Sequence, residues 1–102
     1  GLALSSRNKY LSAEEREIAP GLYRALNYIE NQILNGVHTP SLLLKHQKSE
    51  LEAKGFKIDY LDVFDEKTLQ PVETLTEGGE YILAGAVWLG KTRLIDNFLI
   101  EL

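Results

Sequence analysis

The residues best suited to chemistry stand at the start of the chain, in the run Leu4-Ser5-Ser6-Arg7. Ser5 and Ser6 supply hydroxyl groups and backbone N–H donors with little bulk. Arg7 adds a planar guanidinium whose donors match the oxygens of a phosphate, and Lys9 adds a point charge. Leu4 has no polar side-chain atom, so it can contact an anion only through its backbone. This combination predicts a loop that binds a polyphosphate.

The same run has a second interpretation, as a serine-rich, flexible tail with incidental basic residues. Short polar and basic segments are common, and a motif indicates a function only in its structural context. On charge pattern alone, the flexible tail is the more frequent case. Both interpretations stay open at this level.

A second stretch, from Gly85 to Thr92, satisfies the P-loop formula of glycine, four residues and then Gly-Lys-Thr. A working P-loop follows a strand, wraps phosphate with exposed N–H groups and opens a helix. Here Val87, Trp88 and Leu89 favour burial, and the residues after Thr92 are strand-like. We therefore interpret the stretch as a strand followed by a hairpin turn.

The elements that position these residues begin with helices. Ser12-Ala13-Glu14-Glu15 has the form of a capping box, which predicts a short helix from Ala13 to about Ile18. Pro20-Gly21 interrupts the helical run after this short helix, and we expect a second, longer helix to begin near Pro20. Apolar residues at three- and four-residue spacing predict one buried stripe on these helices: Ile18, Leu22, Ala25, Leu26, Ile29 and Ile33.

A third helix and the strands follow. Thr39 as the cap and Pro40 at the first helical position start the helix, and Gly55 ends it. Beyond it the apolar period falls to two, which predicts strands at 57–64, 80–88 and 93–101. The order predicts an α+β fold with helices packed on one face of a three-stranded antiparallel sheet. We expect Tyr81 and Trp88 to be core aromatics of the central strand.

Composition limits the classes of function. A length of 102 residues favours a single domain, and the net charge of −4 argues against a nucleic-acid binder or a membrane-surface protein. The absence of cysteine excludes disulfides and thiol nucleophiles and allows a cytoplasmic location. His38 and His46 share no ligand spacing with each other or with a carboxylate cluster, so we expect no metal site.

Four stretches carry a family resemblance: 1–11, 18–23 with the sequence Ile-Ala-Pro-Gly-Leu-Tyr, 88–90 with Trp-Leu-Gly, and 93–97 with Arg-Leu-Ile-Asp-Asn. Together they resemble the carboxy-terminal domain of pantothenate synthetase, the pantoate–beta-alanine ligase family, from the first residue to the last. The most specific part is Ser5-Ser6-Arg7-Asn8, which in that family closes over the ATP triphosphate. The resemblance implies that Leu4, Ser5, Ser6 and Arg7 bind ATP, with the last three stabilising charge in the transition state.

The resemblance also implies an organisation and a reaction. Residues 1–102 would be a lid domain, with an ATP-phosphate loop at 1–11, a helical part at 12–55 and an antiparallel sheet at 56–102. The amino-terminal nucleotide-binding domain of the family is missing from this sequence, and the first residue, Gly1, falls inside a motif, which suggests a fragment.

The implied parent is a cytoplasmic homodimer that joins pantoate and beta-alanine through a pantoyl adenylate, using ATP with Mg²⁺. The fragment alone would be inactive. The alternative is a free-standing binding module with a flexible tail.

Overall fold

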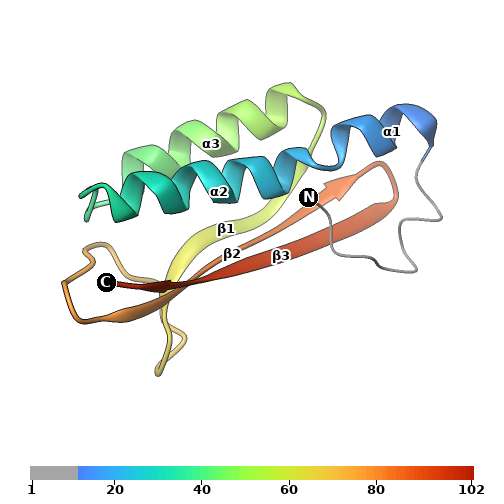
Figure 1. Cartoon of the computed structure of the whole chain (residues 1–102). Coiled ribbons are helices and arrows are strands. Elements are labelled where there is room, and N and C mark those ends of the chain that lie inside the picture. Colours follow the sequence, from blue (N-terminus) through green and yellow to red (C-terminus); the bar gives the residue numbers. More distant parts are fainter. Residues whose placement is uncertain (1–11) are drawn as a thin grey trace.

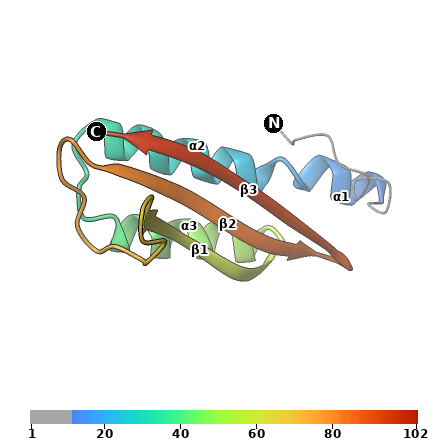
Figure 2. The same cartoon turned by 90° about the horizontal axis from the view of Figure 1, so that it is seen from below.

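The structure is a computed structural model and describes residues 12–102. Its elements in chain order are α1 (Ala13–Ile18), α2 (Gly21–Leu34), α3 (Ser41–Ala53), β1 (Lys57–Asp65), β2 (Glu80–Leu89) and β3 (Thr92–Glu101). The strands form one sheet in the order β1-β2-β3, and both pairs are antiparallel. In Figures 1 and 2, α2 and α3 lie on the same face of this sheet. The predicted α+β fold is confirmed.

The start of α1 is a complete capping box. The Ser12 hydroxyl oxygen accepts from the Glu15 backbone N–H at 3.1 Å, and the Glu15 carboxylate accepts from the Ser12 N–H at 3.0 Å. Two of the N–H groups that a helix start leaves without partners are thereby satisfied. Because α1 contains no buried side chain, the caps hold this short helix together more than packing does.

The core lies between α2, α3 and the sheet. The predicted stripe on α2 is buried, and Ile18 packs partly buried at its edge. The strands and α3 supply the opposing side chains, which are Leu44, Leu51, Leu61, Val63, Tyr81, Leu83, Val87, Leu89, Leu94 and Ile100. Burial of this apolar surface is the main favourable contribution to folding.

Gly85 marks the closest approach of helix and sheet. A Cβ added there would lie 3.0 Å from Leu61 Cδ1 and 3.1 Å from Leu22 Cδ1. A glycine inside a strand commonly marks such an approach. The missing side chain at Gly85 therefore allows Leu22 of α2 to reach the floor of the sheet.

Trp88 corrects one expectation. Its neighbours Val87 and Leu89 are buried, but Trp88 itself is 39% exposed. Side chains alternate along a strand, so Trp88 points to the face away from the helices. The prediction that it is a core aromatic is wrong, whereas Tyr81, 5% exposed, does lie in the core.

The start of α3 also differs from the prediction. Pro40 occupies the cap position, one residue before the helix, and no side-chain cap hydrogen bond is formed there. Thr39 is exposed, while Pro40 is fully buried. The proline ring thus contributes to the core instead of beginning the helix behind a threonine cap.

The stripe on α2 leads to a stability prediction. Leu26→Ala is expected to lower the free energy of unfolding by about 2–5 kcal/mol, because the side chain is fully buried and its removal leaves a cavity. Urea unfolding followed by circular dichroism measures the change. The matched control is Leu42→Ala on α3, where the side chain is 79% exposed and the expected change is within about 0.5 kcal/mol. Equal losses in the two variants would contradict this packing.

Candidate functional site

The predicted phosphate-binding residues, Leu4, Ser5, Ser6 and Arg7, lie outside the described residues. What the structure describes is the end of the domain to which this segment is joined. That end contains Ser12, the start of α1 and the turn between β2 and β3 (Figure 1).

Glu15 connects the start of α1 to the β2–β3 turn. Gly90 in that turn has a φ of +60°, a conformation that favours glycine. The Glu15 carboxylate occupies the space that a Cβ on residue 90 would need. The same carboxylate accepts from the Ser12 N–H. One side chain therefore links Ser12, the first described residue, to the tip of the hairpin.

Basic side chains gather at this end of the sheet. Lys57, Trp88 and Arg93 occupy one row across the three strands, in the register Lys57↔Trp88 and Trp88↔Arg93. Side chains paired in this way lie on the same face of a sheet. Lys91 follows in the hairpin turn. We call Lys57, Trp88, Lys91 and Arg93 the basic corner.

The basic corner borders a shallow cavity of about 660 Å³, lined by Gly55, Lys57, Trp88, Gly90 and Lys91. Within residues 12–102, neither Lys57 nor Lys91 has a carboxylate within 4.0 Å. Lys57, Lys91 and Arg93, set against the carboxylates of Asp59 and Glu15, leave this surface with a net positive charge beside an exposed indole, and such a surface attracts anions. This surface lies at the same end as the junction with the predicted phosphate loop.

Arg93 differs from the two lysines because it is already paired. Its Nη2 lies 2.8 Å and its Nε 3.0 Å from Asp59 Oδ2. Asp59 stands at an irregularity of β1, where the register with β2 shifts between Ile58 and Tyr60. The ion pair therefore spans from β3 to β1 across the central strand. Both side chains are partly exposed, so the pair orients Arg93 more than it stabilises the fold.

The P-loop-like stretch is a strand and a turn, as interpreted from its sequence. Gly85 to Leu89 belongs to β2, Gly90 and Lys91 form the turn, and Thr92 begins β3. A strand and not a helix follows the lysine, so the N–H groups of this stretch form no phosphate cradle of the P-loop kind.

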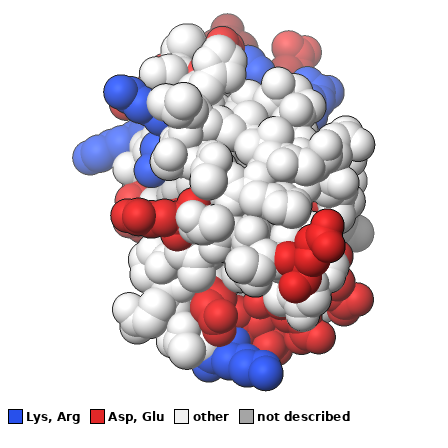
Figure 3. Space-filling model, turned by 90° about the vertical axis from the view of Figure 1, so that its left-hand side faces the viewer, with Lys and Arg blue, Asp and Glu red and all other residues white. Residues whose placement is uncertain are grey.

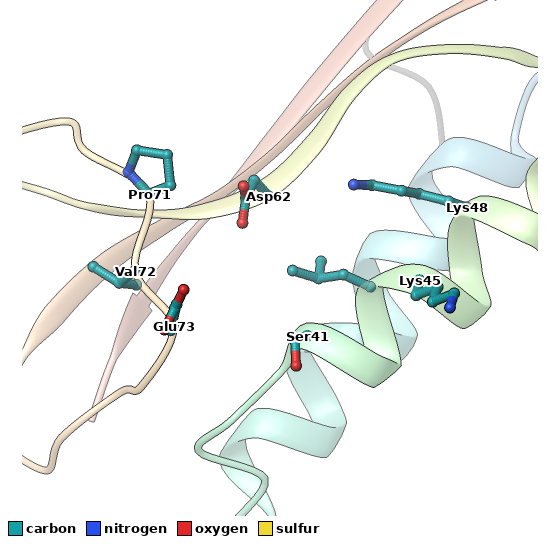
Figure 4. Close-up of a pocket in the computed structure, with 8 residues that line it drawn as sticks. Ser41, Lys45, Lys48, Asp62, Pro71, Val72 and Glu73 are labelled. Atoms are coloured by element: carbon teal, nitrogen blue, oxygen red, sulfur yellow. The ribbon is translucent and has the colours of Figure 1, made fainter.

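A second cleft, of about 360 Å³, lies between α3, β1 and the loop before β2 (Figure 4). Lys48 of α3 extends toward Asp62 of β1, Glu73 lies on the loop across the cleft, and Lys45 lines the cleft with its ammonium directed away from both carboxylates. Within the described part of the chain, these four charges form no ion pair shorter than 4.0 Å. Because both signs are present in equal number, the cleft has no preference for an anion.

Asp65 organises the turn that follows β1. Backbone N–H groups of Thr68 and Lys67 donate to its carboxylate at 3.0 and 2.8 Å, and these bonds hold the pKa of Asp65 below its usual range. Since folding lowers the pKa of Asp65, its ionised carboxylate stabilises the folded state at neutral pH. This stabilisation is lost as the pH falls through the lowered pKa. The role of Asp65 is structural.

Features of other kinds of site are few in this part of the molecule. Among residues 12–102, no group of three or more His, Cys, Asp or Glu side chains could hold a metal ion, and no helix is long and apolar enough to cross a membrane. His46 is exposed on α3, with Nε2 at 3.7 Å from Glu50, and His38 is half-buried. Figure 3 shows one end of the molecule as largely uncharged at its centre, with carboxylates and a smaller number of Lys and Arg side chains around its edge.

The two-layer fold and the sequence of the chain are both similar to those of known proteins. A sequence model described as "Pantoate-beta-alanine ligase" matches residues 1–99. The chain belongs to the pantoate–beta-alanine ligase family.

Named relatives agree with this assignment. The chain is 46% identical over 97 residues to the pantothenate synthetase of Pseudomonas savastanoi pv. phaseolicola, a match that covers 95% of this chain and 34% of that protein. It is 51% identical over 98 residues to the pantothenate synthetase of Rhodospirillum rubrum, again over 95% of this chain and 34% of that protein.

A solved structure supports the same fold. The pantothenate synthetase of Thermus thermophilus is similar with a TM-score of 0.80 and 39% identity, over 100% of this chain and 36% of that one. The chain thus spans about a third of the length of the relatives that it matches.

The contact between Glu15 and the hairpin leads to a prediction. Gly90→Ala is expected to lower the free energy of unfolding by about 1–2 kcal/mol for the positive φ, and by about 0.5–1 kcal/mol more because the new methyl group displaces Glu15 from its cap. Urea unfolding measures the total, and amide hydrogen exchange at Ser12 reports the loss of the cap.

Gly78→Ala is the matched control. Gly78 also has a positive φ, of +85°, but nothing lies within 4 Å of its added Cβ. It should therefore show only the backbone cost and leave the exchange rate of the Ser12 amide unchanged. Equal destabilisation by the two variants, with slow exchange at Ser12 in both, would contradict the role of Glu15.

Proposed function

We propose that this chain is the carboxy-terminal domain of an enzyme that joins pantoate to beta-alanine at the expense of ATP. The observation that carries the proposal is the family match over residues 1–99, which includes the run Ser5-Ser6-Arg7-Asn8. The name of the relatives supplies the product, and the description of the family supplies the two substrates that are joined. Because those relatives are about three times as long, the whole reaction belongs to a longer protein and not to this chain alone.

The proposed reaction has two steps. A carboxylate oxygen of pantoate attacks the α-phosphorus of ATP, the bond from that phosphorus to the β-phosphate oxygen breaks, and pyrophosphate leaves with its electron pair. The amine of beta-alanine then attacks the acyl carbon of the pantoyl adenylate. A C–N bond forms, the bond from the acyl carbon to the phosphate oxygen breaks, AMP leaves, and the amine loses a proton to solvent.

This chain's part in the reaction is electrostatic. Negative charge builds on the β- and γ-phosphates as pyrophosphate leaves, and donors already in position stabilise it without reorganisation. We assign this role to Arg7 with Ser5 and Ser6, and backbone contact with ATP to Leu4. Lys57 and Lys91 of the basic corner support the assignment, because they add positive potential at the end of the domain where this segment is joined.

We assign the metal ion and the binding sites for pantoate and beta-alanine to parts of the enzyme outside this chain. Mg²⁺ would arrive with the triphosphate, since no carboxylate or histidine cluster of residues 12–102 fits a metal ion. The binding of pantoate and beta-alanine is assigned chiefly to the amino-terminal nucleotide-binding domain of the longer protein. In this proposal residues 1–102 form its lid, which closes over ATP and excludes water from the adenylate. The longer protein would be a homodimer in the cytoplasm.

Arg7 provides the direct test. In the longer protein, Arg7→Ala is expected to lower turnover by about 10²–10³, the usual effect of removing a donor aimed at developing charge. Arg7→Lys should restore only part of the rate, because a single ammonium cannot replace the guanidinium fork. Steady-state release of pyrophosphate with saturating substrates measures both variants.

Arg24→Ala is the control for this test, since Arg24 is an exposed arginine on the outer side of α2. Its turnover should equal that of the unmodified protein. A rate in Arg7→Ala that also stays near the unmodified value would refute the assignment of Arg7.

The isolated chain gives a second test. It should not form pantothenate, and it should bind ATP weakly, because a single closing loop bears the entropic cost of ordering without most of the contacts. Amide chemical shifts during an ATP titration would report binding at Ser5 to Arg7 residue by residue. Micromolar affinity of the isolated chain would instead indicate a self-contained nucleotide-binding module and would overturn the proposed lid.

A further inference from the structure

The cleft between α3, β1 and the loop before β2 is separate from the cavity at the basic corner, since the two share no lining residue. Its volume of about 360 Å³ falls within the range of roughly 300–1,000 Å³ that sites for small molecules occupy. Apolar and charged side chains both line it (Figure 4). The cleft therefore has the size and the mixed lining of a small-molecule site.

The loop that forms one wall of the cleft is fastened to the edge of β1. The Val72 N–H donates to the Val63 carbonyl oxygen at 3.0 Å, and the Asp65 N–H donates to the Gln70 carbonyl oxygen at 2.9 Å. Pro71 lies between the two bonded loop residues and lines the cleft. This wall is thus part of the fold and needs no ligand to form it.

The opposite wall is held by the core. Leu44 of α3 packs in the hydrophobic cluster, is 6% exposed and lines the cleft. Lys48 follows about one helical turn later and is half-buried. Because both walls are fixed before a ligand arrives, binding does not bear the entropic cost of ordering them.

Opposite charges border the cleft without pairing. Lys48 extends toward Asp62 of β1, and Glu73 lies on the loop across the cleft (Figure 4). Within residues 12–102, Lys48 forms no ion pair with either carboxylate. The ammonium of Lys45 is directed away from both. The charged groups available to a ligand are therefore one ammonium and two carboxylates.

The carboxylate of Asp62 is oriented but not fully used. Its Oδ1 accepts from the Val63 N–H at 2.8 Å, which fixes the direction of the group. Its Oδ2 accepts no hydrogen bond from residues 12–102. A carboxylate has room for about four hydrogen bonds, so Asp62 retains capacity for a donor from a ligand.

We propose that this cleft binds a free α-amino acid with an apolar side chain. A simple anion would face two carboxylates, and a simple cation would leave Lys48 without a partner. A zwitterion satisfies both signs, with its ammonium toward Asp62 and Glu73 and its carboxylate toward Lys48. Leu44 and Val72 provide the apolar contacts for its side chain. This site is independent of the proposed function, since it involves neither ATP nor the ligase reaction.

A matched set of small molecules tests the proposal on this chain. L-Leucine is the probe, isopentylamine lacks its carboxylate, 4-methylpentanoate lacks its ammonium, and glycine lacks its side chain. Leucine should bind with a dissociation constant of about 1 mM, as suits a small ligand in an open cleft. Each of the other three should bind about tenfold more weakly, because it loses one set of contacts. Amide chemical shifts of residues 44, 48, 62 and 73 report the binding.

Variants assign the two charged ends of the ligand. Lys48→Met keeps the apolar stem and should remove the roughly tenfold preference for leucine over isopentylamine, because no ammonium remains to bind the carboxylate. Glu73→Gln should weaken both of these ligands but not 4-methylpentanoate. Glu73 is exposed, so its thermal midpoint should stay unchanged. Such changes in selectivity do not follow from a loss of folding.

Lys45→Met is the matched control, and it should bind leucine as the unmodified chain does. Equal weakening by Lys45→Met and Lys48→Met would overturn the proposal. So would unchanged amide shifts at about ten times the expected dissociation constant. Equal affinity for leucine and isopentylamine in the unmodified chain would make the cleft a cation site instead, and equal affinity for leucine and glycine would exclude a role for the apolar side chain. None of these measurements requires formation of pantothenate, so the failure of this site and the failure of the proposed function are distinguishable.

Discussion

The fold depends on the contact between α2 and the centre of the sheet. One apolar stripe on α2 supplies most of the helical side of the core, and Gly85 allows Leu22 to reach the strand floor beside Leu61. The other helices add less, since α1 buries no side chain and α3 buries two, Leu44 and Leu51. Because the domain has only two layers, one face of the sheet packs closely against the helices and the other face has no helix on it within the described residues.

Glu15 couples this core to the functional end. Its carboxylate caps α1 and also contacts the hairpin turn at Gly90, so the start of the helical layer and the tip of the sheet are held together. Lys57, Trp88 and Arg93 are in turn aligned by strand register. The basic corner and the junction of the phosphate loop therefore keep a fixed relation to each other.

Local patterns were sufficient to predict the elements. The capping box, the stripe on α2 and the turn glycines gave helix and strand bounds within one or two residues of those observed. Trp88 was misplaced because burial was inferred from apolar neighbours, although strict alternation with Val87 and Leu89 would have placed it outside. The Asp59–Arg93 pair could not be predicted, since it depends on a shift of register between strands distant in sequence. For the candidate site, the sequence motif and the family resemblance indicate Ser5 to Arg7. The basic corner could not be predicted in this way, because its residues are brought together only by the pairing of the three strands.

The arrangement of the strands also has a consequence for the order of folding. β2 and β3 are joined by a two-residue turn at Gly90 and Lys91, so their pairing closes the shortest loop in the sheet. β1 joins β2 only after closure of the longer segment from 66 to 79, which costs more chain entropy. The hairpin that carries Trp88 and Lys91 is thus expected to assemble first, and it provides the template on which α2, and then the edge strand β1, complete the domain.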